Sequence, residues 1–509
     1  MNQSRHAGVP DARRAGAAGA GLAASLYRPL TEADVRKVAD AAFAVLEKSG
    51  VAVYSPTALA AFRAAGAEVS SSLSLGAEGR AGGVVRLPRA LVEDAVASNP
   101  SSVTLYSRDG RSDAVLEANR VYYGTGGTAI YVLDPDTGER RRSTTADVVL
   151  NARLVDTLEH VHVFTINVFP NDITEKDEID VNRFFHSLDN TTKHVMGGVY
   201  SMAGCRSVVE MAEMIAGGAE ALRARPVVSF ITLIISPFKV DRDYGEVTCY
   251  LAREGLPVVV PTEPMCGTTA PITLAGGVLV NTAETLAGIA LVQCVRKGAP
   301  GICGSVGSVS DLRTMGNLSG PIERAMLNAA VAQMAQHFRL PLYSTAGTSD
   351  AKSVDVQAAY ESAMSNLLVA MSGANYIHDA AGLLEFDLTV AYEKLVVDDE
   401  ILGMCQRVLR GIEVNDETLA TDLLIRKGPG QDFLAEEHTV THMRGEFFLP
   451  RLASRDRRER MKPGTDALSR AKAFVRQVRE QAPQSRLSKD VRAQILRTFP
   501  EIRSPGPHG

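Results

Sequence analysis

The side chains best suited to chemistry stand where short apolar runs of the sequence end. Glu263 follows the run 257–262, Asp350 comes shortly after 341–345, and His378 ends the run 375–378. Carboxylates and imidazole rings hold protons, offset positive charge and orient polar substrates. A histidine in such a place is as often a buried structural residue, but a strand end favours function. We therefore take these three residues as catalytic candidates.

Aromatic residues also gather near the ends of these runs, although the chain has no tryptophan and only 6% aromatic residues. A quaternary ammonium group has no N–H to donate, so a protein binds it with aromatic faces, carboxylates and shape. Packing against loops is the alternative for any single ring. The candidate substrate-binding residues are Tyr123, Tyr131, Phe169, Tyr200, Phe238, Lys352 and Tyr376.

The segment 345–363 is a polar loop of small residues that leads into a helix. A lysine and a helix N-terminus both favour a carboxylate, so Lys352 is a candidate for binding the acidic end of a substrate. Asp350 is either a site residue or a helix cap. For Asp355, the role of N-cap is the preferred interpretation.

No metal site is expected. The six cysteines form no CxxC pair, and no Cys/His run has zinc spacing. His438 and His442 are four residues apart but lack the HExxH pattern. We interpret the cysteines as reduced, buried thiols in a cytoplasmic protein.

The composition excludes several classes of protein. The chain has 509 residues, 45% hydrophobic, and a net charge of −5, so neither disorder nor nucleic-acid binding is expected. Apolar runs such as 227–235 are far shorter than the ~20 residues of a membrane span. We therefore expect a protein without nucleic-acid or membrane partners.

From residue 121 onward, apolar strand-like runs alternate with amphipathic helical segments. Continuous apolar strands between helices indicate a parallel sheet that is buried on both faces, and eight such units predict a (β/α)8 barrel. A doubly wound open sheet is the alternative, but the GTGGT turn leads into a hairpin with its turn at 134–138 and not into a helix. The predicted strands are 121–124, 162–168, 194–200, 227–235, 257–262, 300–304, 341–345 and 375–378, with helices over 145–158, 176–189, 204–218, 242–254, 272–297, 320–337, 354–372 and 392–411.

Four regions follow from these patterns. Residues 1–30 are rich in Ala, Gly and Arg and are expected to form a disordered tail. An N-terminal α/β cap over 31–120 begins with a helix over 31–50 that Thr31 caps. The catalytic barrel spans 121–415, and a helical extension with a charged tail spans 416–509.

Several motifs in order along residues 30–455 resemble the trimethylamine methyltransferase family. They are GTGGTAIYVLDPDTGERR, EPMCGTTAPITLAGG, GSVGSVSDLRTMG, STAGTSDAKSVDVQAAYESA, GANYIHDAAGLLE and YEKLVVDDEILGMCQRVLRGIEV. The resemblance implies a (β/α)8 barrel that moves a methyl group from a methylated amine to the Co(I) of a corrinoid protein. The archaeal trimethylamine enzymes carry pyrrolysine, whereas this chain has only the twenty standard residues.

The chain therefore resembles the branch without pyrrolysine, which is similar to glycine betaine:corrinoid methyltransferases. The resemblance implies a betaine substrate, with trimethylamine as the alternative. No DxHxxG corrinoid-binding motif is present, so no tightly bound cofactor is expected, and the cobalamin is expected on a separate protein that docks over 264–271 and 304–321. Barrels of this kind are often homo-oligomers. Two other hypotheses stay open: a barrel enzyme that uses Lys352 as a Schiff base, and a betaine-binding barrel without catalysis.

Overall fold

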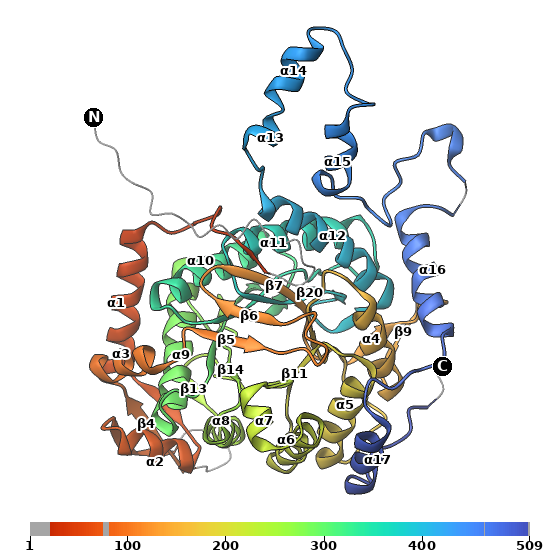
Figure 1. Ribbon diagram of the computed structural model, residues 1–509. Helices are drawn as coiled ribbons and strands as arrows, with labels where there is room; N and C mark the ends of the chain where they lie inside the picture. The colour runs from red at the N-terminus through yellow and green to blue at the C-terminus, as the bar shows by residue number, and fades with distance from the viewer. Residues whose placement is uncertain (1–20, 75–80, 463, 507–509) are drawn as a thin grey trace, which may run out of the picture.

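Eight parallel strands close into a barrel. The computed structural model describes residues 21–74, 81–462 and 464–506. The last barrel strand pairs with the first, which closes the cylinder and confirms the predicted (β/α)8 fold (Figure 1). All eight predicted strands are present, several shorter than their apolar runs. They are β7 (Arg120–Thr125), β10 (Val163–Thr165), β11 (His194–Gly198), β12 (Val228–Ile231), β14 (Val258–Val260), β16 (Gly301–Gly304), β19 (Leu342–Thr345) and β20 (Tyr376–Ala381).

A ring of helices surrounds the barrel, and each of the eight predicted helices is found. The apolar runs become strands because both faces of this sheet are buried, one in the barrel interior and one under the helices. The helices are α4 (Thr145–Thr157), α5 (Lys176–Asn190), α6 (Met202–Ala216), α8 (Arg242–Glu254), α9 (Leu274–Val295), α10 (Ile322–Phe338), α11 (Val356–Met371) and α12 (Tyr392–Arg410), with a short α7 (Ala219–Ala224) after α6.

Helix α9 is, within the part of the chain described, the one helix whose length and hydropathy would also suit a membrane span. Of its most apolar window, 83% is buried inside the protein. Its residues pack against α1, α3, α8 and α10, so its hydropathy is explained by its place in the core.

A hairpin fills the amino-terminal end of the barrel. Strands β5 (Ser102–Leu105) and β6 (Ala114–Glu117) pair antiparallel and lie in front of the barrel strands in Figure 1. Leu105 and Leu116 of the hairpin are fully buried in one cluster with Val259 and Ile302 of the barrel strands. This end of the barrel is therefore closed by apolar packing.

The amino-terminal cap packs against one side of the barrel. It contains α1 (Glu32–Lys48), β2 (Val51–Val53), α2 (Pro56–Ala64), β3 (Glu68–Ser74), β4 (Ala81–Arg86) and α3 (Arg89–Ser98). Thr31 caps α1 as predicted, because its hydroxyl accepts from the Asp34 N–H at 3.2 Å and the Asp34 carboxylate accepts in return. The short strand β13 (Lys239–Val240) extends the cap sheet by pairing with β2.

The predicted tail over residues 1–30 is wrong in its boundary. Residues 1–20 lie outside the described residues. Strand β1 (Leu22–Ala23) pairs antiparallel with β7, and the N–H groups of Leu26 and Tyr27 both donate to the Met371 carbonyl. The chain is therefore ordered from at least residue 21, since its backbone joins the barrel.

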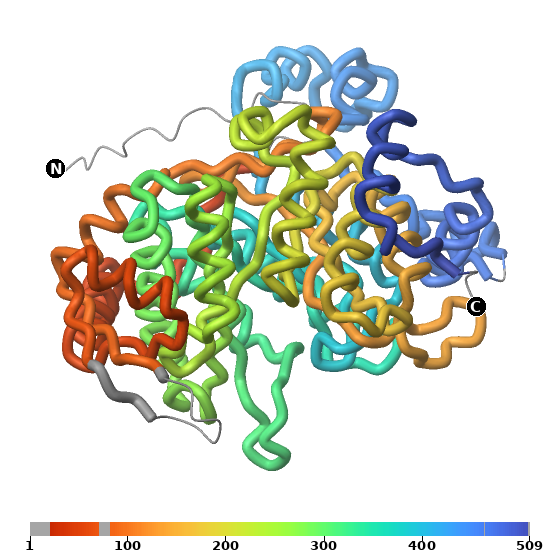
Figure 2. The backbone as a smooth tube through the Cα atoms, turned by 90° about the horizontal axis from the view of Figure 1, so that it is seen from below, coloured from red at the N-terminus to blue at the C-terminus, as the bar shows by residue number. Residues whose placement is uncertain are grey.

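The predicted hairpin after the first barrel strand is confirmed. Strands β8 (Tyr131–Leu133) and β9 (Arg140–Arg142) pair antiparallel around the turn that Asp134 organises. Strands β21 (Leu383–Leu384) and β22 (Thr389–Ala391) join them in a small sheet beside the carboxyl ends of the barrel strands. Another small sheet, β15 (Met265–Cys266), β17 (Ser308–Asp311) and β18 (Gly316–Leu318), follows β14 and β16. The β17–β18 hairpin projects from the carboxyl end of the barrel (Figure 2).

After α12 the chain leaves the barrel. Helices α13 (Asp416–Leu419), α14 (Thr421–Lys427) and α15 (Glu437–Glu446) form a projecting arm, which we define as residues 411–450 (Figure 1). The chain then returns through a short 3-10 turn (Arg458–Arg460) to α16 (Ala467–Glu480), which packs on α12 and α4, and to α17 (Lys489–Thr498), which packs on α6.

A buried ion pair fixes two loops at the carboxyl end of the barrel. Lys394 and Asp398 of α12 are each about 1% exposed, and their charged atoms lie 2.7 Å apart. Lys394 Nζ also donates to the Gly347 carbonyl in the loop after β19, and Asp398 accepts from the Gly382 N–H after β20. The hydroxyl of Ser362 supplies a further hydrogen bond to Asp398. One pair therefore holds both loops against α12.

We predict that Lys394→Met lowers the free energy of unfolding by about 3–5 kcal/mol, because it leaves the Asp398 carboxylate buried without its cation. Chemical denaturation measures the change. The matched control is Lys297→Met, whose partner Asp94 lies in an exposed pair and whose loss costs at most about 1 kcal/mol. Equal losses in the two variants would contradict the role given to the buried pair.

Candidate functional site

His378 lies inside the barrel near the end of β20. Its ring stacks on Tyr343 of β19, with centroids 4.0 Å apart. Its Nδ1 is 2.7 Å from the Ser344 carbonyl, and its Nε2 is 2.8 Å from Oδ2 of Asp379. The carbonyl and carboxylate oxygens are both hydrogen-bond acceptors. Both nitrogens are thus engaged in holding neighbours.

Asp379 is the residue that His378 holds. It is buried in the left-handed region, at φ 61°, which suits an aspartate better than a β-branched residue. Burial opposes its ionisation, but His378, Arg324 and the Thr345 hydroxyl outweigh burial and lower the pKa of Asp379. Its Oδ1 has no hydrogen-bond partner among the described residues, and a Cβ at Gly126 would come within 2.2 Å of that oxygen. Glycine is therefore required where the first loop passes Asp379.

Arg324 enters the same region from the first turn of α10. It is 3% exposed, and its NH1 donates to Asp387 Oδ2 at 3.0 Å and to Thr348 at 2.8 Å. Its Nε and NH2 have no partner in the described part of the chain. A buried guanidinium with unpaired N–H groups is costly, so these donors are available for an anionic group.

Glu263 lies in the loop after β14. Its side chain is open to solvent, although protein surrounds it on most sides, so the carboxylate is recessed. Desolvation in the recess raises the pKa of Glu263 to about 7; Arg324 opposes the rise, and Asp387 and Asp379 add to it. These mutual effects, together with that of His378 on Glu263, place the five groups in one cluster. We call Glu263, Arg324, His378, Asp379 and Asp387 the mouth cluster.

Asp350 and Lys352 lie at the edge of the mouth cluster. Asp350 accepts from the Ser319 N–H at 2.8 Å, and burial raises its pKa. Lys352 is exposed; its Nζ donates to the Asp350 carbonyl and lies 4.3 Å from the centre of the Phe386 ring. The exposed Lys352 lacks the desolvated position that a Schiff-base lysine requires.

The charges of the mouth are predominantly negative. Three carboxylates, of Glu263, Asp379 and Asp387, surround the buried guanidinium of Arg324, and the carboxylate of Asp350 lies beside Asp387. Such an excess of negative charge in a recess attracts a cation. The unpaired nitrogens of Arg324 add a point at which an anionic group can bind.

Two of the predicted aromatic residues belong to the barrel strands. Tyr376 points inward, and its hydroxyl shares a hydrogen bond of 2.7 Å with Thr165. Tyr123 is also fully buried, but it packs beside His162 in the cluster between strands and helices. The adjacent Tyr122 is the residue that faces the barrel interior. The structure therefore does not bring Tyr123 to the mouth cluster.

The remaining predicted aromatic residues do not form a shared cage. Arg140 lies 4.3 Å from the centre of the Tyr131 ring and covers it. Phe169 and Tyr200 meet edge to face at 5.4 Å, at the ends of β10 and β11. Phe238 lies apart from them, where its N–H donates to Glu284 and its carbonyl accepts from β2. Carboxylates, and not an aromatic wall, therefore dominate the mouth.

The sequence patterns did not indicate Arg324, Asp387 or Tyr343 as site residues. Arg324 and Glu323 are a charged pair at the start of a helix rich in alanine, which is the one signal that the sequence offered for Arg324. Asp387 follows Glu385 and Phe386, and all three have positive φ, so the tight turn after β21 could not be seen in the periodicity. Asp355 is the N-cap of α11, as preferred, since Ala358 N–H donates to it at 3.0 Å.

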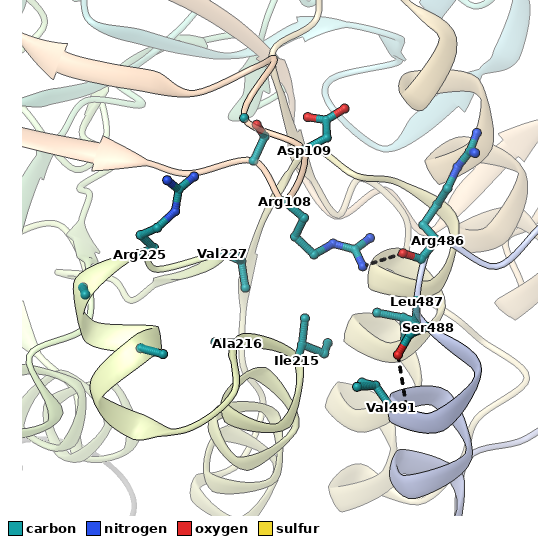
Figure 3. Close-up of a pocket in the computed structure, with 14 residues that line it drawn as sticks. Arg108, Asp109, Ile215, Ala216, Arg225, Val227, Arg486, Leu487, Ser488 and Val491 are labelled. Carbon is teal, nitrogen blue, oxygen red and sulfur yellow. Dashed lines mark hydrogen bonds between the residues drawn. The ribbon is translucent and has the colours of Figure 1, made fainter.

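A large cavity of about 860 Å³ lies elsewhere, between the β5–β6 turn, α6, α7 and α17 (Figure 3). Its arginines already have partners: Arg108 donates to main-chain carbonyls, Arg225 lies near Asp113, and Arg486 pairs with Asp156. The described residues contain no group of three or more metal-binding side chains. The mouth cluster is therefore the best candidate for the reactive site.

Comparisons with known proteins identify the family and the fold of the chain. Residues 5–504 match the sequence family described as trimethylamine methyltransferase (MTTB). Trimethylamine methyltransferase MttB of Desulfitobacterium hafniense DCB-2 is 35% identical, over 82% of this chain and 81% of its own length. Glycine betaine methyltransferase of D. hafniense Y51 is 32% identical, over 84% and 87%. The crystal structure of the hydroxylamine MtmB complex shares the fold with a TM-score of 0.50 at 11% identity, over 93% and 87% of the two chains.

We predict that the protein binds tetramethylammonium more tightly as the pH rises from 6 to 8. Glu263 is mostly neutral below its pKa of about 7 and mostly charged above it, so the attraction grows as it ionises, by up to about tenfold. Calorimetry across this range measures the dissociation constant. Glu263→Gln should remove the pH dependence, whereas Glu139→Gln, in the exposed β8–β9 turn, should keep it. An unchanged profile in Glu263→Gln would refute the assignment.

Proposed function

Since the chain belongs to the trimethylamine methyltransferase family and is a methyltransferase, we propose that it takes the methyl group of a quaternary amine that also carries a carboxylate. Glycine betaine is the simplest such compound, and a relative bears its name. The methyl acceptor in this proposal is the Co(I) of a corrinoid on a separate protein. The observation that carries the proposal is the mouth cluster, in which carboxylates surround one buried arginine with unpaired N–H groups.

The reaction itself needs little acid–base chemistry from the protein. The N–CH3 bond breaks, its electron pair stays on nitrogen as a neutral tertiary amine, and the methyl group forms its new bond to cobalt. When the corrinoid is bound, its Co(I) supplies the nucleophile. The work of the chain is to orient one N–CH3 bond toward the acceptor and to exclude water from the cation.

The two charged ends of a betaine match two parts of the mouth cluster. The carboxylates of Glu263 and Asp387 offset the ammonium charge. The Nε and NH2 of Arg324 then bind the substrate carboxylate, in the planar geometry that guanidinium groups favour. Lys352 at the rim adds a second, exposed cation. A trimethylamine molecule, which has no carboxylate, would leave Arg324 unpaired.

His378 acts as a positioning residue in this proposal. Its two nitrogens are held by Ser344 and Asp379, and its ring is held by Tyr343. Its role is to keep Asp379 charged and fixed beside Arg324. Tyr376 forms part of the floor below through its bond to Thr165. The Phe169–Tyr200 pair offers the aromatic face nearest the ends of β10 and β11.

The corrinoid protein docks on the surface around the β17–β18 hairpin. Leu312 and Met315 at its tip are 56% and 62% exposed. Ile272 is 60% exposed and lies beside Leu312, since a Cβ at Gly267 would contact both side chains. Exposed apolar side chains at one rim are typical of a protein-binding surface. This surface coincides with the loops 264–271 and 304–321.

We predict that the effect of Arg324→Met on kcat/KM depends on whether the substrate carries a carboxylate. With reduced cobalamin as acceptor, methylcobalamin formation from glycine betaine should fall at least tenfold in kcat/KM, because a charged hydrogen bond is lost. The visible absorption of methylcobalamin reports the rate for glycine betaine, proline betaine, carnitine, choline and trimethylamine.

In the same panel, the parent protein should prefer a betaine over choline, and Arg324→Met should narrow that preference. Arg313→Met, an exposed arginine of the nearby hairpin turn, is the matched control and should keep it. A parent protein that turns over trimethylamine but no betaine would overturn the proposed substrate. Binding of a betaine without methyl transfer to cobalamin or to the corrinoid protein would overturn the reaction.

We predict that Leu312→Asp raises the KM for the corrinoid protein by about tenfold and leaves the rate with free cobalamin unchanged. The reason is that Leu312 contacts the carrier protein and not the reacting groups. Steady-state kinetics with both acceptors measures the two effects. Equal effects on both acceptors would place Leu312 in the reaction itself and contradict its docking role.

A further inference from the structure

The cavity of about 860 Å³ between the β5–β6 turn, α6, α7 and α17 has one side rich in arginine and one apolar side (Figure 3). Arg108 and Arg225 lie along its upper side in that view, and Ile215, Ala216 and Val491 lie below them. Small-molecule sites in proteins have volumes of roughly 300–1,000 Å³ and combine an apolar lining with a few polar groups. The cavity therefore has the size and the lining of a ligand site, at the end of the barrel away from the mouth cluster.

Arg108 carries a positive charge that its contacts do not neutralise. Among the described residues, its guanidinium donates to the main-chain carbonyls of Leu188, Thr191 and Arg486 and to no carboxylate. Its Nε is buried and has no partner in that part of the chain. Burial lowers the pKa of Arg108 to about 10, although three aspartates nearby oppose the fall, so the side chain is still charged at neutral pH. A mostly buried cation whose partners are all neutral favours an anion beside it.

Two further arginines, Arg225 and Arg486, line the cavity. Arg225 NH2 lies 3.8 Å from the Asp113 carboxylate, and Arg486 NH2 lies 2.7 Å from that of Asp156, but neither aspartate is part of the lining. Asp109, the one acidic residue among the described lining residues, already accepts two hydrogen bonds. The lining therefore carries three positive charges against one negative charge, and this excess attracts an anion.

Asp189, near the end of α5, fixes the wall of the cavity that α17 supplies. Its carboxylate accepts from the Ser485 hydroxyl and, at 3.0 Å, from Arg492 Nε, and its carbonyl accepts from the Arg486 N–H at 2.7 Å. Ser488 caps α17 within the lining, so the positive end of the helix dipole adds to the charge of the arginines. The site is therefore preformed, because contacts within the chain hold this wall in place.

We propose that this cavity binds an organic carboxylate with an apolar body, such as a medium-chain fatty acid. The carboxylate lies beside Arg108, whose NH1 makes one hydrogen bond within the described residues and has a second N–H to donate. The apolar body packs on Ile215, Ala216 and Val491. An inorganic anion would leave the apolar side uncovered, and a neutral alcohol would leave the charge of Arg108 uncompensated. The proposal is independent of the reaction at the mouth cluster, because the two sites share no residue.

Calorimetry with octanoate and the full-length protein tests the proposal. The parent protein should bind one octanoate per chain. It should bind octanol and inorganic phosphate at least about tenfold more weakly, because each lacks one half of the interaction. Hydrogen exchange measured by mass spectrometry should show that octanoate protects the segments 107–110, 215–227 and 486–491, which line the cavity.

Two variants locate the binding without disturbing Arg108, whose hydrogen bonds join three segments of the chain. Ala224→Trp fills the cavity from an exposed position of α7, and Arg225→Met removes one positive charge from the lining. Each should weaken octanoate binding at least about tenfold and leave the circular dichroism unchanged. Arg223→Met is the matched control and should bind octanoate like the parent, since Arg223 pairs with Glu254 outside the lining.

Three results would overturn the proposal. The first is a parent protein that binds no octanoate. The second is equal octanoate binding by the parent and by Ala224→Trp, or protection from hydrogen exchange that lies only in the arm or at the mouth, since either would place the ligand elsewhere. The third is phosphate binding as tight as octanoate binding, which would show that the apolar side contributes nothing.

Discussion

The site depends on the ion pair between Lys394 and Asp398, two side chains that are not part of the mouth cluster. Asp398 accepts from Gly382, Lys394 donates to Gly347, and the loops after β19 and β20 are thereby tied to one turn of α12. These loops carry Thr348 and lead to Asp387, the two side chains that hold Arg324. Two opposite charges buried together satisfy each other at a desolvation cost, and the geometry they impose would be lost if either were removed. Rigid support behind a reactive surface is what precise substrate orientation requires.

The mouth combines charges that would repel one another in isolation. Burial alone would keep Asp379 neutral, yet His378 and Arg324 hold it ionised, whereas Glu263 lacks such a close partner and has a pKa near neutrality. Two carboxylates in one recess thus have different protonation states because their neighbours differ. A permanent cation that enters this recess would offset its excess of negative charge.

The sequence allowed the barrel to be predicted almost completely, because buried parallel strands and their covering helices leave a strong periodic pattern. It also located Glu263, Asp350 and His378, since barrel topology brings strand ends together wherever they fall in the chain. The prediction failed for Tyr123 because successive side chains of a strand lie on opposite faces of the sheet, so a shift of one residue changes the face. In this strand Tyr122, and not Tyr123, faces the barrel interior. Arg324 and Asp387 were missed because their pairing joins a helix to a loop 63 residues further along the chain, in a left-handed turn that no local pattern predicts.

The β5–β6 hairpin has a kinetic consequence. Because its leucines close the amino-terminal end of the barrel, the carboxyl end is left as the way into the interior, and in the proposed reaction the amine and the much larger corrinoid carrier share it. Whichever arrives first decides whether the other can enter. Under the proposed function, the amine must therefore bind before the carrier, and the demethylated product can leave only after the carrier has departed. A barrel interior with a single opening implies a compulsory order of substrate addition. A large excess of carrier would slow turnover, because the carrier would block the opening of barrels that hold no amine.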